Sequence, residues 1–218
     1  MGFLDKIFSK KEEVKYKAIL KQVSRPLMEK ISRIREKDIR IFFEKIVDAS
    51  EKVLRVFLFQ TEIFNYKKEI TKEEFCHWIE KVSLVMIAYS YYCVVLVKNW
   101  YNLDDLYLKG IPYIEWFDKV FGYYNQVFNK NITKKDVDYY ASGYKEDAEK
   151  GYSKKENQEK VSETCERDYK TIGSDLLKEI WGEDAEKENL DKRIFIGARI
   201  WQCHAQLIRS YLEELAKK

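Results

Sequence analysis

The sequence predicts an all-α protein, a single-domain bundle of six or seven helices with a long, heptad-patterned C-terminal helix. The 218 residues include only eight glycines and two prolines, whereas average usage would supply about 26. A many-stranded sheet needs more of both in its tight turns. The chain is 45% hydrophobic and 15% aromatic, so enough apolar surface exists to offset the entropy cost of folding. Apolar residues also recur at steps of three and four, which is the helical period.

The first element is a basic amphipathic segment at residues 1–23, followed by the bundle domain at residues 24–218. Residues 1–37 carry 11 Lys or Arg against 5 Asp or Glu. At 100° per residue, four apolar side chains of this segment share one helical face, namely Phe3, Leu4, Ile7 and Phe8. Such a face predicts contact with a membrane surface or a partner. The alternative is that the same face packs on the protein's own bundle.

Local signals then predict where the helices begin and end. Capping boxes, in which a Ser or Thr is followed three residues later by an acidic residue, occur at Thr71–Glu74, Thr133–Asp136 and Ser153–Glu156. Pro26 and Pro112 suit the first turn of a helix. Gly151 and Gly182 suit the position just after a helix.

Between these boundaries, apolar stripes predict which faces are buried. The helix near residues 38–56 carries Ile39, Phe42, Ile46, Ala49, Val53 and Val56. The helix near residues 113–129 carries Ile114, Phe117, Phe121, Tyr124 and Phe128. The helix near residues 154–181 carries Val161, Cys165, Tyr169, Ile172, Leu176 and Ile180. The uncharged run Val82–Val97 is too short to span a membrane, so we interpret it as the centre of a buried helix.

The last helix has the most regular pattern. A heptad seam runs along it through Ile194, Ala198, Trp201, Ala205, Ile208, Leu212 and Leu215. Three glycines fall inside expected helices rather than at their ends, namely Gly122, Gly173 and Gly197. We expect them to mark places where two helices cross closely.

The same helix holds the string Arg199-Ile-Trp-Gln-Cys-His204. This string resembles the short Arg-x4-His motif of the HEPN family, whose all-helical domains often act as metal-independent ribonucleases. The resemblance implies a homodimer cleft in which His204 serves as acid or base and Arg199 holds the scissile phosphate. The other interpretation is an ordinary surface arginine beside a partly packed histidine.

Neither histidine completes a metal site. Glu74 and His77 form one Glu-x-x-His motif, but a di-iron bundle needs two. The Cys-His pairs at 76–77 and 203–204 would have to converge to bind zinc. We therefore expect no metal and no cofactor. Four widely spaced cysteines predict free thiols and a cytoplasmic location.

Tyrosines gather in the second third of the chain, and the candidates for an interface are Tyr123, Tyr124, Tyr139, Tyr140 and Tyr144. Tyrosine is enriched at protein interfaces, but it also packs in helical cores.

Taken together, these features predict a non-enzymatic cytoplasmic protein that works through protein or membrane-surface contacts. Its partner is another protein or a second copy of the chain, with weak membrane contact through the N-terminus as a further option. A net charge of +3 does not favour nucleic acid. The alternative from a different class is the HEPN-like ribonuclease.

Overall fold

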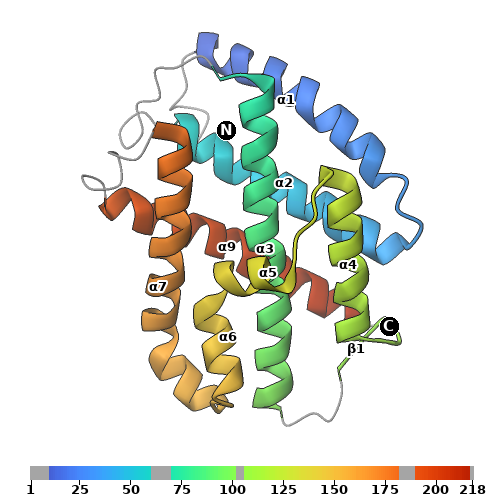
Figure 1. Cartoon of the computed structure of the whole chain (residues 1–218), viewed down its shortest axis with the longest axis vertical. Coiled ribbons are helices and arrows are strands. Elements are labelled where there is room, and N and C mark those ends of the chain that lie inside the picture. Colours follow the sequence, from blue (N-terminus) through green and yellow to red (C-terminus); the bar gives the residue numbers. More distant parts are fainter. Residues whose placement is uncertain (1–9, 60–69, 102–105, 182–189, 217–218) are drawn as a thin grey trace. The chain divides into compact units, whose positions relative to one another are not determined.

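The computed structural model describes residues 10–59, 70–101, 106–181 and 190–216, and helices form nearly all of its secondary structure (Figure 1). In chain order the elements are α1 (Lys10–Ile31), α2 (Lys37–Phe59), α3 (Lys72–Trp100), β1 (Tyr107–Leu108), β2 (Ile111–Pro112), α4 (Tyr113–Phe128), α5 (Lys134–Tyr140), α6 (Ser142–Glu149), α7 (Lys154–Trp181) and α9 (Leu190–Ala216). The expected all-α class is confirmed. The two short strands form an antiparallel hairpin that the sequence pattern did not reveal.

Three helices begin where capping boxes are predicted. The amide of Thr71 donates to the Glu74 carboxylate at 2.9 Å, and the amide of Glu74 donates to the Thr71 hydroxyl at 3.1 Å. The box at 153–156 forms the same two bonds, at 2.8 and 3.3 Å. At the start of α5 the amide of Thr133 donates to the Asp136 carboxylate at 2.6 Å. These contacts satisfy amides that helix formation would otherwise leave unpaired.

The expected helix start at Pro26 is wrong, because Pro26 lies inside α1. An interior proline costs a helix about 3 kcal/mol. Val23, Leu27 and Ile31 are buried on both sides of it, and their burial outweighs that cost.

Helix α1 also runs without a break across residues 23 and 24. The division into a segment at 1–23 and one domain at 24–218 stays a prediction.

By its internal contacts the chain divides into two compact units, residues 1–83 and residues 84–218, and the boundary falls within α3. In the first unit, the stripe predicted for α2 is buried from Ile39 to Val53. A buried hydrogen bond of 3.0 Å joins the hydroxyls of Ser50 and Ser83, and Ser50 also bonds the Ile46 carbonyl at 2.8 Å. These two serines are therefore satisfied inside an apolar core.

Helix α3 is long and apolar enough, by length and composition, to cross a membrane. However, 72% of its most apolar window is buried inside the protein, as in the core helix of a globular protein.

In the second unit, α7 buries Tyr169, Ile172, Leu176 and Ile180, as predicted.

Among the elements that the structure describes, α7 and α9 pair most extensively, and two glycines permit this pairing. A Cβ atom added at Gly173 would stand 2.1 Å from the Arg193 carbonyl oxygen. One added at Gly197 would stand 2.2 Å from the Cβ of Tyr169. The expectation of close crossings is confirmed at both positions. It is wrong at Gly122, where nothing lies within 4 Å of such an atom.

The buried face of α9 differs from the predicted heptad seam. Among the side chains of α9 that the structure describes, the buried ones are Ile196, Ile200, His204, Leu207 and Tyr211. The described seam residues, from Ile194 to Ala205, are only half-buried. The close approach at Gly197 explains the difference, since it turns the glycine side of α9 toward α7.

Candidate functional site

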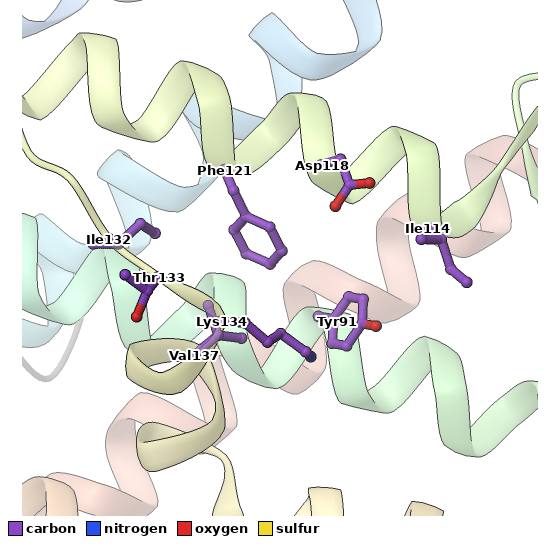
Figure 2. A pocket seen from close by; sticks show the side chains of 8 residues that line it. All are labelled: Tyr91, Ile114, Asp118, Phe121, Ile132, Thr133, Lys134 and Val137. Carbon is purple, nitrogen blue, oxygen red and sulfur yellow. The ribbon is translucent and has the colours of Figure 1, made fainter.

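A groove in the second unit lies between α3, α4 and the start of α5 (Figure 2). Its volume is about 370 Å³, which falls within the range of ligand pockets. Eight residues line it, namely Tyr91, Ile114, Asp118, Phe121, Ile132, Thr133, Lys134 and Val137. Most of this lining is apolar or aromatic, and the polar groups are few.

One wall of the groove comes from α4. This helix buries Tyr113, Trp116, Phe117, Val120, Tyr124 and Val127. The predicted stripe is therefore wrong in part, because Ile114 is 50% exposed, and Phe121 and Phe128 are only half-buried. Helix α4 has more apolar residues than its core face can hold. Two of those left over, Ile114 and Phe121, border the groove.

The opposite wall comes from the reversal of the chain after α4. Asn129 adopts a left-handed conformation (φ 55°) that ends the helix. The side-chain oxygen of Asn125 then accepts the amide of Ile132 at 2.9 Å. The Thr133–Asp136 box starts α5 immediately afterwards, which places Lys134 and Val137 along the groove.

A polar cluster beside the groove joins α5 to α3. The ammonium of Lys134 lies 4.1 Å from the centre of the Tyr91 ring. It also donates to the Tyr92 hydroxyl at 2.9 Å and pairs with Asp138 at 3.2 Å. The Tyr92 hydroxyl in turn donates to Asp138 at 2.5 Å. Burial tends to raise the pKa of Asp138, but hydrogen bonds from Tyr92 and Lys134 outweigh burial and hold it below its ordinary value.

Asp118 is the acidic residue that lines the groove. Its side chain makes no hydrogen bond or ion pair with any residue that the structure describes. Burial raises the pKa of the Tyr91 hydroxyl, and the charges of Asp118 and Asp138 raise it further. The Tyr91 hydroxyl thus lies in a negative potential, even though Lys134 is close to its ring.

The structure does not bring Arg199 and His204 together. His204 is 1% exposed and lies against Tyr89, with ring centres 5.3 Å apart. No well-formed hydrogen bond reaches either ring nitrogen of His204 from the described residues, although the Tyr89 backbone lies nearby. Burial lowers the pKa of His204 to about 3, and the nearby Tyr89 backbone opposes this only in part. Arg199 is exposed, where it bonds Gln202 at 3.1 Å and lies 5.1 Å from the centre of the Phe195 ring. The ribonuclease alternative would therefore require His204 to leave the interior.

The other predicted site residues fall in different settings. Tyr124 and Tyr144 are buried, and Trp201 donates to the Tyr144 hydroxyl at 2.6 Å. Tyr123 and Tyr140 are half-buried, whereas Tyr139 is 51% exposed.

The predicted contact residues Phe3, Leu4, Ile7 and Phe8 lie outside the described residues. In the part of the chain that is described, no three His, Cys, Asp or Glu residues are grouped so that they could hold a metal.

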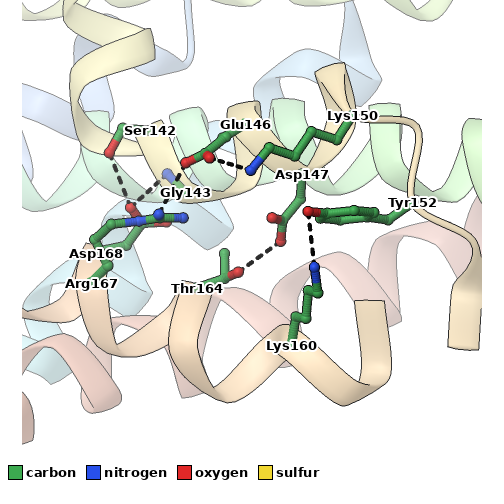
Figure 3. Close-up of polar contacts among 10 residues, drawn as sticks. All are labelled: Ser142, Gly143, Glu146, Asp147, Lys150, Tyr152, Lys160, Thr164, Arg167 and Asp168. Carbon is green, nitrogen blue, oxygen red and sulfur yellow. Dashed lines mark hydrogen bonds and ion pairs between the residues drawn. The ribbon is translucent and has the colours of Figure 1, made fainter. Parts of the chain in front are cut away.

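A second polar cluster joins α6 to α7 (Figure 3). The Asp168 carboxylate, 1% exposed, accepts the Gly143 amide at 2.9 Å and the Ser142 hydroxyl at 3.3 Å on one oxygen. Its other oxygen has no partner among the described residues. Burial raises the pKa of Asp168 to about 6, although the Gly143 amide and the Arg167 charge oppose the shift. Because Asp168 caps α6, we interpret this cluster as structural.

Sequence reasoning missed the groove and Asp168 for different reasons. Asp168 lies four residues before the buried Ile172, and this helical spacing is the signal that could have found it. Tyr91, Asp118 and Lys134 are far apart in sequence and share no motif. No family model, curated protein or solved structure matches the chain.

Proposed function

We propose that the chain is a non-enzymatic, cytoplasmic protein that binds a partner protein, and that the groove between α3, α4 and α5 is the contact surface. The observation that carries this proposal is the uncovered apolar edge of α4, where Ile114 is 50% exposed beside Phe121. An exposed apolar side chain at the rim of a concave, largely apolar groove marks a candidate protein contact site.

The rest of the groove supports binding rather than bond-making chemistry. Lys134 is held by the Tyr92 hydroxyl and the Asp138 carboxylate. These bonds fix α5 against α3, so the walls are ordered before a partner arrives. Preorganised walls lower the entropy cost of association.

Site-specific photo-crosslinking in cells would test the proposal. A benzoylphenylalanine residue at Ile114 reports on the groove, and one at Leu190, which is 44% exposed on α9, serves as the matched control. We expect a crosslinked partner protein from position 114 alone. That partner, once identified and purified, should bind Ile114→Glu about tenfold more weakly than wild type. It should bind Leu190→Glu as well as wild type.

Two results would overturn the proposal. One is equal crosslinking from the two positions. The other is unchanged affinity of the purified partner for Ile114→Glu, with circular dichroism confirming that both glutamate variants fold.

A further inference from the structure

We propose that the groove accepts an arginine side chain of the partner, with the guanidinium beneath Asp118 and the aliphatic part along Ile114 and Phe121. This inference rests on the proposed function and names the chemistry of the partner segment. It starts from the two opposite charges that line the groove, Asp118 and Lys134.

The two charges are not equivalent. The Lys134 ammonium has partners within the protein, since Asp138 is 3.2 Å away and the Tyr92 hydroxyl is 2.9 Å away. Asp118 has no hydrogen-bond or ion-pair partner among the described residues. In Figure 2 the Asp118 carboxylate lies on the α4 side of the groove, between Ile114 and Phe121, and faces the α3 side, where Tyr91 lies. The charge available to a ligand is therefore negative.

The surroundings of Asp118 favour a cation with an apolar stem. The Phe121 ring lies beside the Tyr91 ring, with centres 6.0 Å apart. Lys134 already lies over the Tyr91 ring, so Phe121 is the ring that can attract a cation of the partner. The pKa of Tyr91 is raised mainly by burial, and the charges of Asp118 and Asp138 add to that effect. An apolar peptide segment alone would leave Asp118 partly desolvated without compensation.

Among protein cations, arginine fits this arrangement best. Its planar guanidinium pairs with a carboxylate through two parallel hydrogen bonds, and it stacks on aromatic rings. Its three methylene groups can cover the apolar lining. The volume of about 370 Å³ leaves space for the neighbouring partner residues as well.

Nuclear magnetic resonance titrations of the full chain can test the charge preference with two peptide probes. One probe is acetyl-Leu-Arg-Leu-amide, and the other replaces arginine with citrulline, its uncharged isostere. At low salt we expect resonances of Asp118 and Val137 to shift, with the arginine peptide binding about fivefold more tightly. In Asp118→Asn this preference should disappear. Glu115→Gln, which removes one exposed negative charge from the same helix, should retain it.

The outcomes separate this inference from the proposed function. Equal binding of the two peptides in the groove, or a preference that survives Asp118→Asn, overturns the arginine inference and leaves the contact surface intact. The absence of any groove shift with either peptide also overturns it. Failure of the crosslinking experiment at Ile114 overturns the proposed function instead, whatever the peptides show.

Discussion

Replacing Gly197 with alanine tests whether close backbone contact holds α7 and α9 together. The added Cβ would lie 2.2 Å from the Cβ and 2.3 Å from the Cα of Tyr169. Carbon atoms in contact prefer about 3.5–4.0 Å. Neither Tyr169 atom can rotate away, because both positions follow from the α7 backbone. The two helices must therefore separate by more than about 1 Å, which forfeits at least a quarter to a half of each affected contact.

Two opposing effects set the expected change in the free energy of unfolding. Overpacking of a tight core costs about 1–3 kcal/mol and sometimes more, and a backbone clash of this size belongs at the upper end. Alanine returns about 1 kcal/mol of helix propensity. We therefore expect Gly197→Ala to lower the free energy of unfolding by about 2 kcal/mol, which lowers Tm by about 4–8 °C in a chain of this length.

Gly122→Ala is the matched control, since it makes the same chemical change inside α4 where nothing lies within 4 Å. It should raise the free energy of unfolding by about 0.5–1 kcal/mol. Urea denaturation followed by circular dichroism at 222 nm measures both variants. If Gly197→Ala is as stable as Gly122→Ala, the close-crossing interpretation is wrong.

Three further predictions concern polar groups in the second unit. Burial lowers the pKa of His204 to about 3, below the unfolded value, so its contribution to stability is complete above about pH 6.5 and falls as the pH drops. His204→Leu should therefore abolish a loss of about 2 kcal/mol between pH 7.5 and 5, as measured by urea denaturation at each pH. Burial raises the pKa of Asp168 to about 6, so the pH dependence of its contribution to stability is opposite to that of His204. This contribution is complete below about pH 4 and is lost as the pH rises through 6. Relative to wild type, Asp168→Asn should become less stable by about 2 kcal/mol as the pH falls from 7.5 to 4.5, and a constant difference would contradict the assignment. Tyr92→Phe removes the hydrogen bonds to Asp138 and Lys134 and should cost about 1–2 kcal/mol at pH 7.5, while an unchanged denaturation midpoint would show that the cluster does not fasten α5.

Features with local causes could be predicted from the sequence. The capping box at Thr71–Glu74 needs only four consecutive residues, and α3 begins there. Gly173 and Gly197 stood out because a glycine inside a helix is unfavourable unless a side chain has no room. Both positions proved to be close contacts.

Features set by tertiary packing could not be predicted in the same way. Helices α4 and α9 carry apolar residues on more than one face, so periodicity alone does not tell which face is covered. In α9 the contact at Gly197 decides, and it places His204 in the interior rather than beside the seam. In α4 the uncovered apolar face holds Ile114 and Phe121, and these two residues border the groove.

The capping of α6 by Asp168 has a consequence for the order in which the chain folds. Helix α6 spans eight residues and has Ala141 at its N-cap, with no side-chain cap of its own. Its first turn relies on a carboxylate 25 positions later, through the Gly143 amide. Helix α5, which has a local capping box, can begin before the rest of the unit is in place. Helix α6 should acquire hydrogen-exchange protection only after α7 docks, and it should lose that protection whenever α7 detaches.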